Sequence, residues 1–227
     1  MKPDKRNSRA EPPSRRDTSP VRILEFPSDQ IVGTVEHVGV WDAERGPLLA
    51  TGRVEVPDEG FVSLQVLPVA GTRPAGGGGW SIESRDALVD LSFLLDLPDD
   101  VVTSVNLDHR VEPASVRHLP HLAPGVQLLY LAHAGLTDEA LQWIAQLTNL
   151  TYLQAWGNEF TDAGVQQLVG LQQLVNLYLE EESLSLAAFD FVEQLPALER
   201  LGLQDVELSD AELAALQARL PGVQVGR

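Results

Sequence analysis

The sequence predicts an α/β solenoid, in which strand–turn–helix repeats stack side by side, preceded by a small antiparallel β unit. The main support is a strict period: one apolar pattern starts at Val126, Leu150, Leu174 and Leu198, at equal intervals along the chain. A fixed period of roughly 20 to 50 residues is typical of repeat proteins, where each unit buries its apolar face against its neighbours. The segment before residue 68 instead alternates with period two, which is the pattern of strands.

The composition is that of a folded soluble protein and excludes cysteine chemistry. Hydrophobic residues make up 44% of the 227 residues and charged residues 22%. Cysteine is absent, which excludes a disulfide framework, a thiolate nucleophile and a cysteine-ligated metal. No apolar run is long enough to span a membrane, and the first residues lack the apolar core of a secretory signal, so we expect a cytoplasmic protein.

The formal net charge of −17 is unevenly distributed along the chain. Residues 1–20 hold six of the sixteen basic residues, whereas between Val126 and Gly222 only Arg200 and Arg219 stand against fourteen acidic residues. Such a surface repels phosphate backbones, so the repeats are not expected to bind nucleic acid. It favours basic partners and speeds their encounter. Acidity that serves only solubility is an equally good interpretation.

The chain begins with a basic tail and a β-rich unit. Residues 1–20 are rich in Arg, Ser and Pro, so we expect a disordered tail. It is either a plain flexible terminus or a contact for nucleic acid or for the acidic body of another copy. Residues 21–83 form the predicted β unit, with a hairpin connection at Pro57–Gly60 and a glycine-rich connector near the end. The connector lacks the Gly-Lys-Ser/Thr ending of a phosphate-binding loop.

Residues 84–227 make up the predicted repeat domain. A helix is expected at its start, followed by a strand that matches the strand of a repeat. Together they form an N-terminal cap and a degenerate first repeat over residues 84–125. Full repeats occupy residues 126–222, and a terminal strand is expected at 223–225. The apolar residues expected on one face of the first helix are Leu88, Leu91, Leu94 and Leu95.

Within each repeat, strand positions alternate and the helix start is marked. Counted from the first residue of a unit, positions 4 and 6 are apolar and face the core, whereas positions 3, 5 and 7 face out. Hydroxyl residues followed by aspartate, at Thr137, Thr161 and Ser209, predict helix N-caps. Ser209 with Glu212 also predicts a capping box. Each unit is therefore a strand, a turn and a short helix, with the strands stacked in parallel.

The pattern LxxLxLxxxxLTDxxL resembles the leucine-rich repeat family, specifically the bacterial type with a TDxGL signature, which residues 161–165 match best. The resemblance covers residues from about 101 to 225. It implies a curved solenoid with a concave parallel sheet and convex short helices, and a role in protein recognition. The turn asparagine of the family occurs only at Asn158, and Ala134, Glu182 and Val206 replace it elsewhere. A less regular turn is therefore expected around Glu182.

Outward strand positions gather aromatic side chains in the middle repeats. With neighbouring strands about 4.8 Å apart, Gln154 lies between Tyr130 and Tyr178, and Tyr152 and Trp156 flank it along its own strand. Exposed aromatics form the hot spots of interfaces, although they also stabilise sheets by packing on one another. Acidic residues flank this cluster. The predicted partner-binding residues are Tyr130, Tyr152, Gln154, Trp156, Tyr178, Glu180, Glu181 and Asp205.

An aromatic centre with an acidic rim predicts a non-enzymatic recognition module that binds a basic, partly apolar protein or peptide. No cofactor, metal or membrane is expected as a partner. His109 and His133 beside Asp108, and His118 with His121, are too few ligands for a metal site, and no nucleophile or metal-hydrolase motif occurs. One alternative is a small-molecule-binding or enzymatic function in the β unit, which needs a pocket with convergent polar groups there. Another is a self-assembling role, which would show as concentration-dependent mass.

Overall fold

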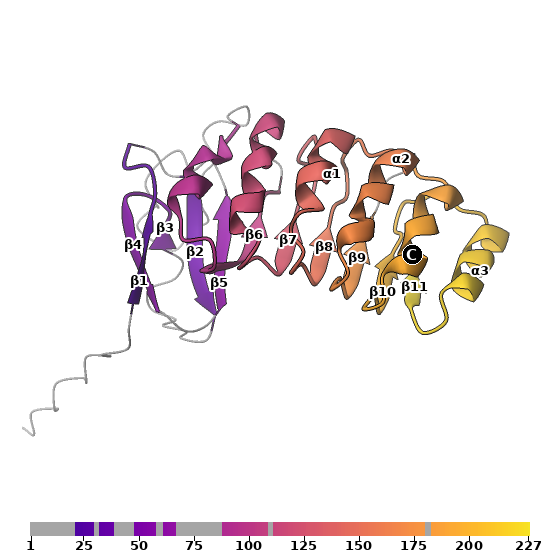
Figure 1. Ribbon diagram of the computed structural model, residues 1–227. Coiled ribbons are helices and arrows are strands. Elements are labelled where there is room, and N and C mark those ends of the chain that lie inside the picture. The colour runs from indigo at the N-terminus through magenta and orange to yellow at the C-terminus, as the bar shows by residue number, and fades with distance from the viewer. Residues whose placement is uncertain are drawn as a thin grey trace, which may run out of the picture.

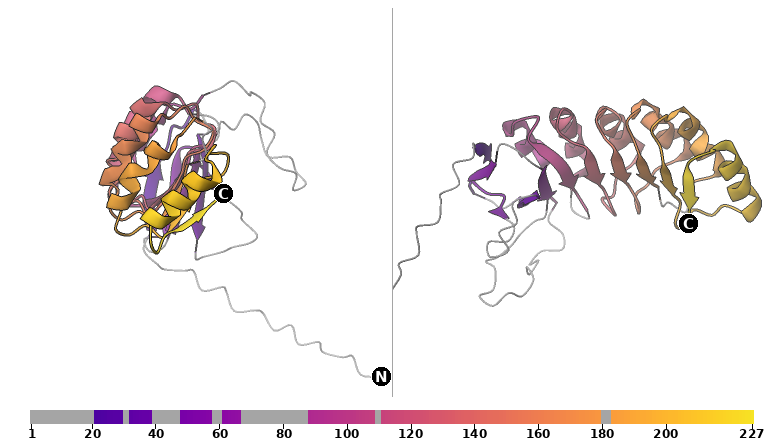
Figure 2. Two further views of the ribbon diagram at one scale, coloured as in Figure 1. Left: turned by 90° about the vertical axis from the view of Figure 1, so that its right-hand side faces the viewer. Right: turned by 90° about the horizontal axis from the view of Figure 1, so that it is seen from below.

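The structure is a computed structural model that describes residues 21–29, 32–38, 48–57, 61–66, 88–108, 111–179 and 183–227. The predicted basic tail, the glycine-rich connector and the turn at Glu182 lie outside these residues. Within them, nine strands form one continuous sheet and two more form a small separate sheet, and the helices cover one side of the larger sheet (Figure 1, Figure 2).

Five strands precede the repeats. They are β1 Val21–Glu25, β2 Gly33–Val38, β3 Leu48–Leu49, β4 Arg53–Pro57 and β5 Phe61–Val66. β1 pairs antiparallel with β4, and β2 pairs antiparallel with both β3 and β5. Buried side chains alternate along them, as at Val54 and Val56 on β4 and at Val62, Leu64 and Val66 on β5. This alternation is the period-two pattern of the sequence expressed as one buried face.

The hairpin predicted at Pro57–Gly60 is wrong, because the strands on either side of it do not pair with each other. β4 pairs with β1, whereas β5 pairs with β2 on one edge and with β6 (Val102–Asn106) on the other. The connection therefore carries the chain from the two-stranded sheet to the nine-stranded one. Turn-forming residues indicate a change of direction, but the apolar face that each strand must bury decides which strands pair.

A threonine bridges the ladder where antiparallel pairing changes to parallel pairing. The register between β5 and β6 shifts between Val62 and Ser63. There the Thr103 hydroxyl donates to the carbonyl oxygen of Val62 at 2.9 Å and accepts from the amide nitrogen of Val62 at 2.9 Å. The side chain thus satisfies backbone groups at the irregularity. The sheet continues from the N-terminal strands into the repeats, and the domain boundary at residue 83 stays a prediction.

Each repeat adds one strand to a parallel sheet. After β6 come β7 Leu128–Tyr130, β8 Tyr152–Gln154, β9 Asn176–Tyr178, β10 Arg200–Gly202 and β11 Gln224–Gly226. Equivalent residues pair from strand to strand, and one such row is Leu128, Tyr152, Asn176, Arg200 and Gln224. Successive members of this row are separated by one repeat, so the period of the sequence is the register of the sheet. Strand order follows chain order, as the repeat pattern predicts.

Short helices follow the strands and lie on one side of the sheet (Figure 2). They are η1 Leu91–Asp96, η2 Pro113–Leu122, α1 Asp138–Ile144, α2 Asp162–Val165, η3 Gln166–Gly170, η4 Leu186–Gln194 and α3 Asp210–Arg219. The η elements are 3₁₀-helices, with three residues per turn.

The apolar face expected along the first helix is wrong in part. Leu91 and Leu94 are buried, as the helical spacing predicts. Leu95 is 51% exposed, because residues four apart do not share a face of a 3₁₀-helix. Leu88 precedes the helix and is 57% exposed.

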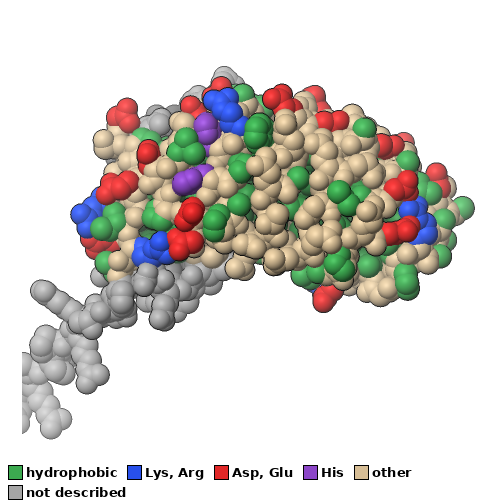
Figure 3. Space-filling model, in the orientation of Figure 1, with side chains coloured by type: hydrophobic (Ala, Val, Ile, Leu, Met, Phe, Trp, Pro, Cys, Tyr) green, Lys and Arg blue, Asp and Glu red, His purple; other side chains and the backbone are tan. Residues whose placement is uncertain are grey.

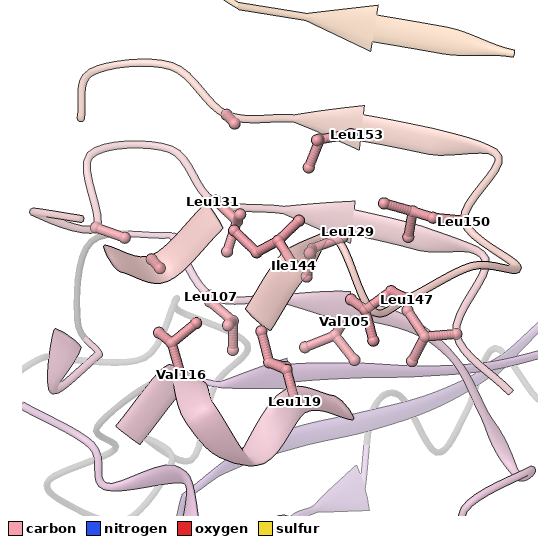
Figure 4. Packing of buried hydrophobic residues seen from close by; sticks show 14 of the residues in the cluster. Val105, Leu107, Val116, Leu119, Leu129, Leu131, Ile144, Leu147, Leu150 and Leu153 are labelled. Atoms are coloured by element: carbon pink, nitrogen blue, oxygen red, sulfur yellow. The ribbon is translucent and has the colours of Figure 1, made fainter. Parts of the chain in front are cut away.

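The core lies between the sheet and the helices. Position 4 of each full repeat holds a leucine that is at most 1% exposed: Leu129, Leu153, Leu177 and Leu201. Figure 4 shows Leu129 and Leu153 on successive strands, with Ile144 approaching from the helix side. Burying one such side chain contributes about 1.5 to 3 kcal/mol. The stacked apolar columns are therefore the main source of stability in the repeats.

Aspartates at the helix starts tie neighbouring repeats together. The Asp138 carboxylate accepts a hydrogen bond from the amide nitrogen of Thr161 at 2.9 Å and another from its hydroxyl at 2.6 Å. Asp162 accepts the same two bonds from Ser185, at 2.9 and 2.5 Å. In the sequence, these aspartates served only as part of the signal for a helix start. The structure shows that they also hold the N-cap residue of the next repeat.

The predicted N-caps form at two of three positions. The Thr161 hydroxyl accepts from the amide nitrogen of Gly164, and the capping box of Ser209 and Glu212 is present. Thr137 makes no side-chain cap bond. A hydroxyl before an aspartate therefore marks the helix start here, whether or not its side chain makes the cap bond.

The side of the molecule over α1, α2 and η3 carries neutral amides. Figure 3 shows few acidic or basic side chains in the middle of this side. Gln166, for example, donates to the carbonyl oxygens of Ala187 and Ala188 in the next repeat at 3.0 and 2.9 Å. The glutamines that bond across repeats are Gln166, Gln167, Gln172 and Gln173. They link the repeats without adding negative charge.

Candidate functional site

The open face is the side of the β6–β11 sheet opposite the helices, formed by repeat positions 3, 5 and 7. On this face the strand register places Gln154 directly between Tyr130 and Tyr178, as the sequence predicts. Tyr152 and Trp156 come from the same repeat as Gln154. All five side chains are partly exposed. The predicted aromatic group is therefore brought together on one surface.

Tyr152, rather than Gln154, is the centre of the ring contacts. Its ring centroid lies 5.0 Å from that of Tyr130 and 5.4 Å from that of Tyr178, with interplanar angles of 38° and 40°. The Tyr152 hydroxyl donates to Oε1 of Gln154 at 2.9 Å. Tyr130 and Tyr178 lie opposite Gln154, which is two residues after Tyr152 on β8. The three tyrosine rings therefore contact one another diagonally across the sheet. We call these three residues the tyrosine row.

Trp156 contacts a histidine instead of the tyrosine row. Its ring stacks on His133 with centroids 6.1 Å apart and an interplanar angle of 28°. The His133 amide donates to the carbonyl oxygen of Trp156 at 2.8 Å, and His133 has a φ of 50°. Gly157 leaves room for this arrangement, because a Cβ atom there would lie 2.0 Å from Nδ1 of His133. In the sequence, His133 stands out only as a possible metal ligand, and no pattern indicates that it stacks on Trp156.

The indole nitrogen of Trp156 is unsatisfied. Among the described residues, its Nε1–H is the one buried side-chain polar atom with no hydrogen-bond partner. A buried donor without an acceptor is rare in folded proteins and calls for a reason. Asn158, two residues later, is by contrast well bonded: it accepts from the Leu136 amide at 3.1 Å and donates to the Leu131 carbonyl at 2.8 Å. This is the turn-stabilising role that the resemblance implied for it.

The predicted acidic rim is described only in part. Glu180 and Glu181 lie outside the described residues, as does His109. Asp205 is exposed and has a φ of 63°. Asp108 accepts from the amide nitrogen of Ala132 at 2.7 Å, so one of its oxygens serves the neighbouring strand. The role of the acidic residues in binding stays a prediction.

A hollow of about 370 Å³, which sequence reasoning missed, lies at the C-terminal end of the open face. Gly202 and Gly226 pair directly on β10 and β11, and the hollow lies over them. A signal existed in the chain: position 5 is occupied by Tyr130, Gln154 and Tyr178 in earlier repeats and by glycine in the last two strands. The other outward residues that line it are Tyr178, Arg200, Gln204 and Gln224.

Three described charged groups have shifted pKa values, and none occupies an outward strand position. Arg22 donates to Asp100 at 2.6 Å and lowers the pKa of that carboxyl. The hydroxyl and amide of Ser209 lower the pKa of Glu212. On the helix side, two acidic neighbours raise the pKa of Arg219. These shifts reflect ion pairs and a helix cap.

The described residues hold no group of three or more His, Cys, Asp or Glu side chains that could bind a metal ion. In the same part of the chain, no helix has the length and apolar character needed to cross a membrane. The alternative site in residues 21–83 stays a prediction, because much of that segment lies outside the described residues.

The repeat geometry defines the class of fold. Each repeat contributes one strand to a parallel sheet and one short helix to its other side, at a constant interval along the chain, with leucine at the core positions. That arrangement is the leucine-rich repeat fold, as the resemblance implied. Whether the repeats belong to the TDxGL type stays a prediction.

Comparison with known proteins adds partial likenesses to two bacterial proteins. No protein-family model and no curated protein sequence matches the chain. Among solved structures, internalin C2 from Listeria monocytogenes shares 24% identity over 62% of this chain and 67% of its own, with a TM-score of 0.43. A leucine-rich repeat protein from Leptospira interrogans shares 18% identity over 60% of this chain and 38% of its own, with a TM-score of 0.37. This chain thus spans less than half of the second protein.

Proposed function

We propose that this protein is a non-enzymatic recognition module that binds a basic, partly apolar protein or peptide on its open face. The observation that carries the proposal is the tyrosine row beside the His133–Trp156 stack, all partly or fully exposed on the side of the sheet opposite the helices. Aromatic side chains supply large contact areas and dominate the binding energy of interfaces. The resemblance to leucine-rich repeat proteins implies that the open face is the concave one.

Charge favours a basic partner. Between Val126 and Gly222 the chain has two basic residues against fourteen acidic ones. One of the two, Arg219, is paired with Asp190 and Glu193 on the helix side. A guanidinium or ammonium group above a tyrosine or tryptophan ring gains about 0.5 to 2 kcal/mol, and an acidic surface raises the local concentration of such groups. A partner with alternating basic and apolar side chains fits this surface.

Trp156 has an energetic reason to rearrange on binding. An unsatisfied buried donor such as its Nε1–H costs about 1 to 3 kcal/mol. A backbone carbonyl of a bound chain can accept this hydrogen bond once the indole turns away from His133. Binding then removes a cost that the unbound protein carries.

The proposal is tested by selecting peptides from a random displayed library on the wild-type protein and on the Tyr130→Ala/Trp156→Ala variant. We expect the wild type to enrich sequences that combine Arg or Lys with apolar residues. The variant should bind those peptides at least about tenfold more weakly, because it loses two hot-spot side chains of roughly 1 kcal/mol or more each. Binding is measured by calorimetry with the synthetic peptides.

A matched control replaces two exposed residues of α1 and the turn that follows it, in the variant Gln142→Ala/Gln146→Ala. These side chains bond to backbone carbonyls of their own helix, so binding should not change. Circular dichroism melts establish that all three proteins are folded. Equal peptide affinities for the wild type and the aromatic variant, or enrichment of acidic peptides, would refute the proposal.

A further inference from the structure

We propose that the hollow over β10 and β11 is a pocket for a carboxylate of the polypeptide that binds on the open face. The proposal rests on the proposed function, and it adds a second kind of contact to it. The rest of the repeat surface favours positive charge, whereas this end of the sheet selects a negative group. The partner would then carry basic residues over the tyrosine row and a carboxylate beyond it.

The pocket exists because two outward positions lack side chains. Gly202 and Gly226 are direct partners on neighbouring strands, so the floor between them is backbone. A Cβ atom added at Gly202 would lie 2.3 Å from Cδ1 of Tyr178, which shows that the Tyr178 ring leans over this glycine. A Cβ atom added at Gly226 would meet no other atom within 4 Å. The hollow is therefore walled by Tyr178 on one side and open above Gly226.

Arg200 provides the charge that the pocket needs. It precedes Gly202 at an outward position and is exposed. No acidic side chain of the described residues forms an ion pair with it. Arg227 also borders the hollow, but its guanidinium donates to the Leu208 carbonyl and lies 3.7 Å from the Asp210 carboxylate. Within the described part of the chain, Arg200 thus stands on the lining as a cation without a carboxylate partner.

The chemistry of the lining selects a monovalent, planar anion. A guanidinium binds a carboxylate through two parallel hydrogen bonds, and the side-chain amides of Gln204 and Gln224 offer further donors. A phosphate would bring a second negative charge toward a protein of net charge −17, with one unpaired guanidinium to meet it. A volume of about 370 Å³ suits the end of a side chain or of a peptide.

Continuity with the tyrosine row identifies the carboxylate as part of the bound polypeptide. Tyr178 belongs to the row and is also the wall of the pocket. Three strand spacings separate β7 from β10, or about 14 Å. An extended chain covers that distance with about four residues. One short peptide can therefore contact Tyr130 and Arg200 at once.

The pocket itself is tested with small probes in NMR titrations. N-acetylglycine, a model of a chain end, should produce saturable shifts in the backbone amides of Gly202 and Gly226 and in the Arg200 Nε–H signal. N-acetylglycinamide, which lacks the charge, should produce none at the same concentration. Shifts of equal size with both probes, or shifts confined to other residues, would overturn the pocket.

Three variants test whether the shifts caused by N-acetylglycine arise from the pocket. Arg200→Gln should abolish the acid-dependent shifts, and Gly226→Val should do so by filling the hollow with a side chain that strands accept. Arg53→Gln makes the same change of charge on β4, where Arg53 pairs with the exposed Glu55 at 3.4 Å, and should leave the shifts intact. Persistence of the shifts in both pocket variants would overturn the proposal.

The source of the carboxylate is tested with the peptide acetyl-Arg-Leu-Arg-Leu-Gly as its free acid and as its amide, and with a glutamate-ended amide. The free acid or the glutamate form should bind about three- to tenfold tighter than the plain amide, since one charge-assisted contact is added in a partly exposed site. Arg200→Gln should remove that difference. N-acetylglycine binding without any gain for either peptide would make the pocket a site for small acids and overturn the link to a polypeptide.

The aromatic variant separates this inference from the proposed function. Tyr130→Ala/Trp156→Ala leaves Tyr178 and Arg200 in place, so it should still bind N-acetylglycine. If peptides then bind wild type and variant alike while the probe still reports the pocket, the proposed function fails and the pocket stands. If the peptides distinguish wild type from variant but N-acetylglycine does not bind, the pocket fails alone.

Discussion

At the scale of single residues, contacts between neighbouring repeats decide what each side chain on the open face can do. Tyr152 is held between two other rings and through its hydroxyl by Gln154, so the tyrosine row is pre-organised before a partner arrives. Such pre-organisation lowers the entropy cost of binding. The Trp156 indole is held differently, because it stacks on His133. A side chain at Gly157 would clash with that histidine. The residue at position 157 must therefore be glycine because of His133 in the neighbouring repeat.

Substituting two glycines in the turns after β7 and β8 distinguishes the cost of backbone strain from the effect of a side-chain clash. Gly135 and Gly157 have φ values of +65° and +64°, so alanine at either site should cost about 1 to 2 kcal/mol of unfolding free energy, measured in urea. A Cβ atom at Gly135 meets nothing within 4 Å, whereas at Gly157 it would lie 2.0 Å from His133. Only Gly157→Ala should therefore shift the Trp156 indole Nε1–H signal in NMR spectra. An unchanged signal in that variant would contradict the stack.

At the scale of elements, short helices are stabilised at their starts more than along their length. Four of the helical segments are 3₁₀-helices, and Asp138 and Asp162 each hold the N-cap residue of the helical segment in the next repeat. A leucine at position 186 interrupts this series, and the next helix, α3, relies on its own capping box instead. The sequence predicted that box, because Ser209 and Glu212 are close together on one chain. It did not show the bonds between repeats, which depend on how the repeats stack.

The capping box gives α3 a pH-dependent contribution to stability. Hydrogen bonds from Ser209 lower the pKa of Glu212 below its usual value near 4.5. A carboxyl with a depressed pKa stabilises the fold above the unfolded-state pKa, and this contribution disappears as the pH falls through the folded-state pKa. The difference in unfolding free energy between wild type and Glu212→Gln should therefore be largest near pH 6 and shrink below about pH 4.5.

Chemical denaturation between pH 3 and pH 7 measures this difference. Ser209→Ala should give the same trend, because it removes the hydroxyl that donates to the carboxylate rather than the carboxyl itself. A difference between wild type and Glu212→Gln that does not vary with pH would show that the cap contributes through packing alone.

At the scale of the whole molecule, one sheet joins the N-terminal strands to the repeats, and the charge of the protein is far from neutral. The nine strands follow the order β3, β2, β5 and then β6 to β11. The net charge of −17 acts over distances longer than any contact on the open face. The net charge therefore governs the association rate of a partner, whereas contacts with the aromatic rings govern its dissociation rate.

Salt should slow the association of the selected basic peptides. Raising the ionic strength from 0.1 M to 1 M shortens the screening length from about 10 Å to 3 Å. We expect the association rate constant to fall by about tenfold or more and the dissociation rate constant to change far less, as measured by stopped-flow fluorescence. Peptides with glutamine in place of the basic residues serve as the control. An association rate that is independent of salt would contradict electrostatic attraction.

The sequence by itself determined the repeat, the register and the core, because spacing along a strand or helix is a local property that recurs in every repeat. From it follow the parallel order of strands, the buried leucine column and the placement of Gln154 between Tyr130 and Tyr178. These features need no knowledge of distant contacts beyond the assumption that equal units stack.

Only the tertiary structure decided which side chains touch. It paired β4 with β1 instead of β5, made Tyr152 the middle of the ring contacts, turned Trp156 toward His133, and opened the hollow beside Arg200. Each of these depends on ring orientations or on strands far apart in the chain, which a period cannot encode. The physical reason is that repetition specifies positions along the backbone, whereas packing between unequal side chains specifies the surface.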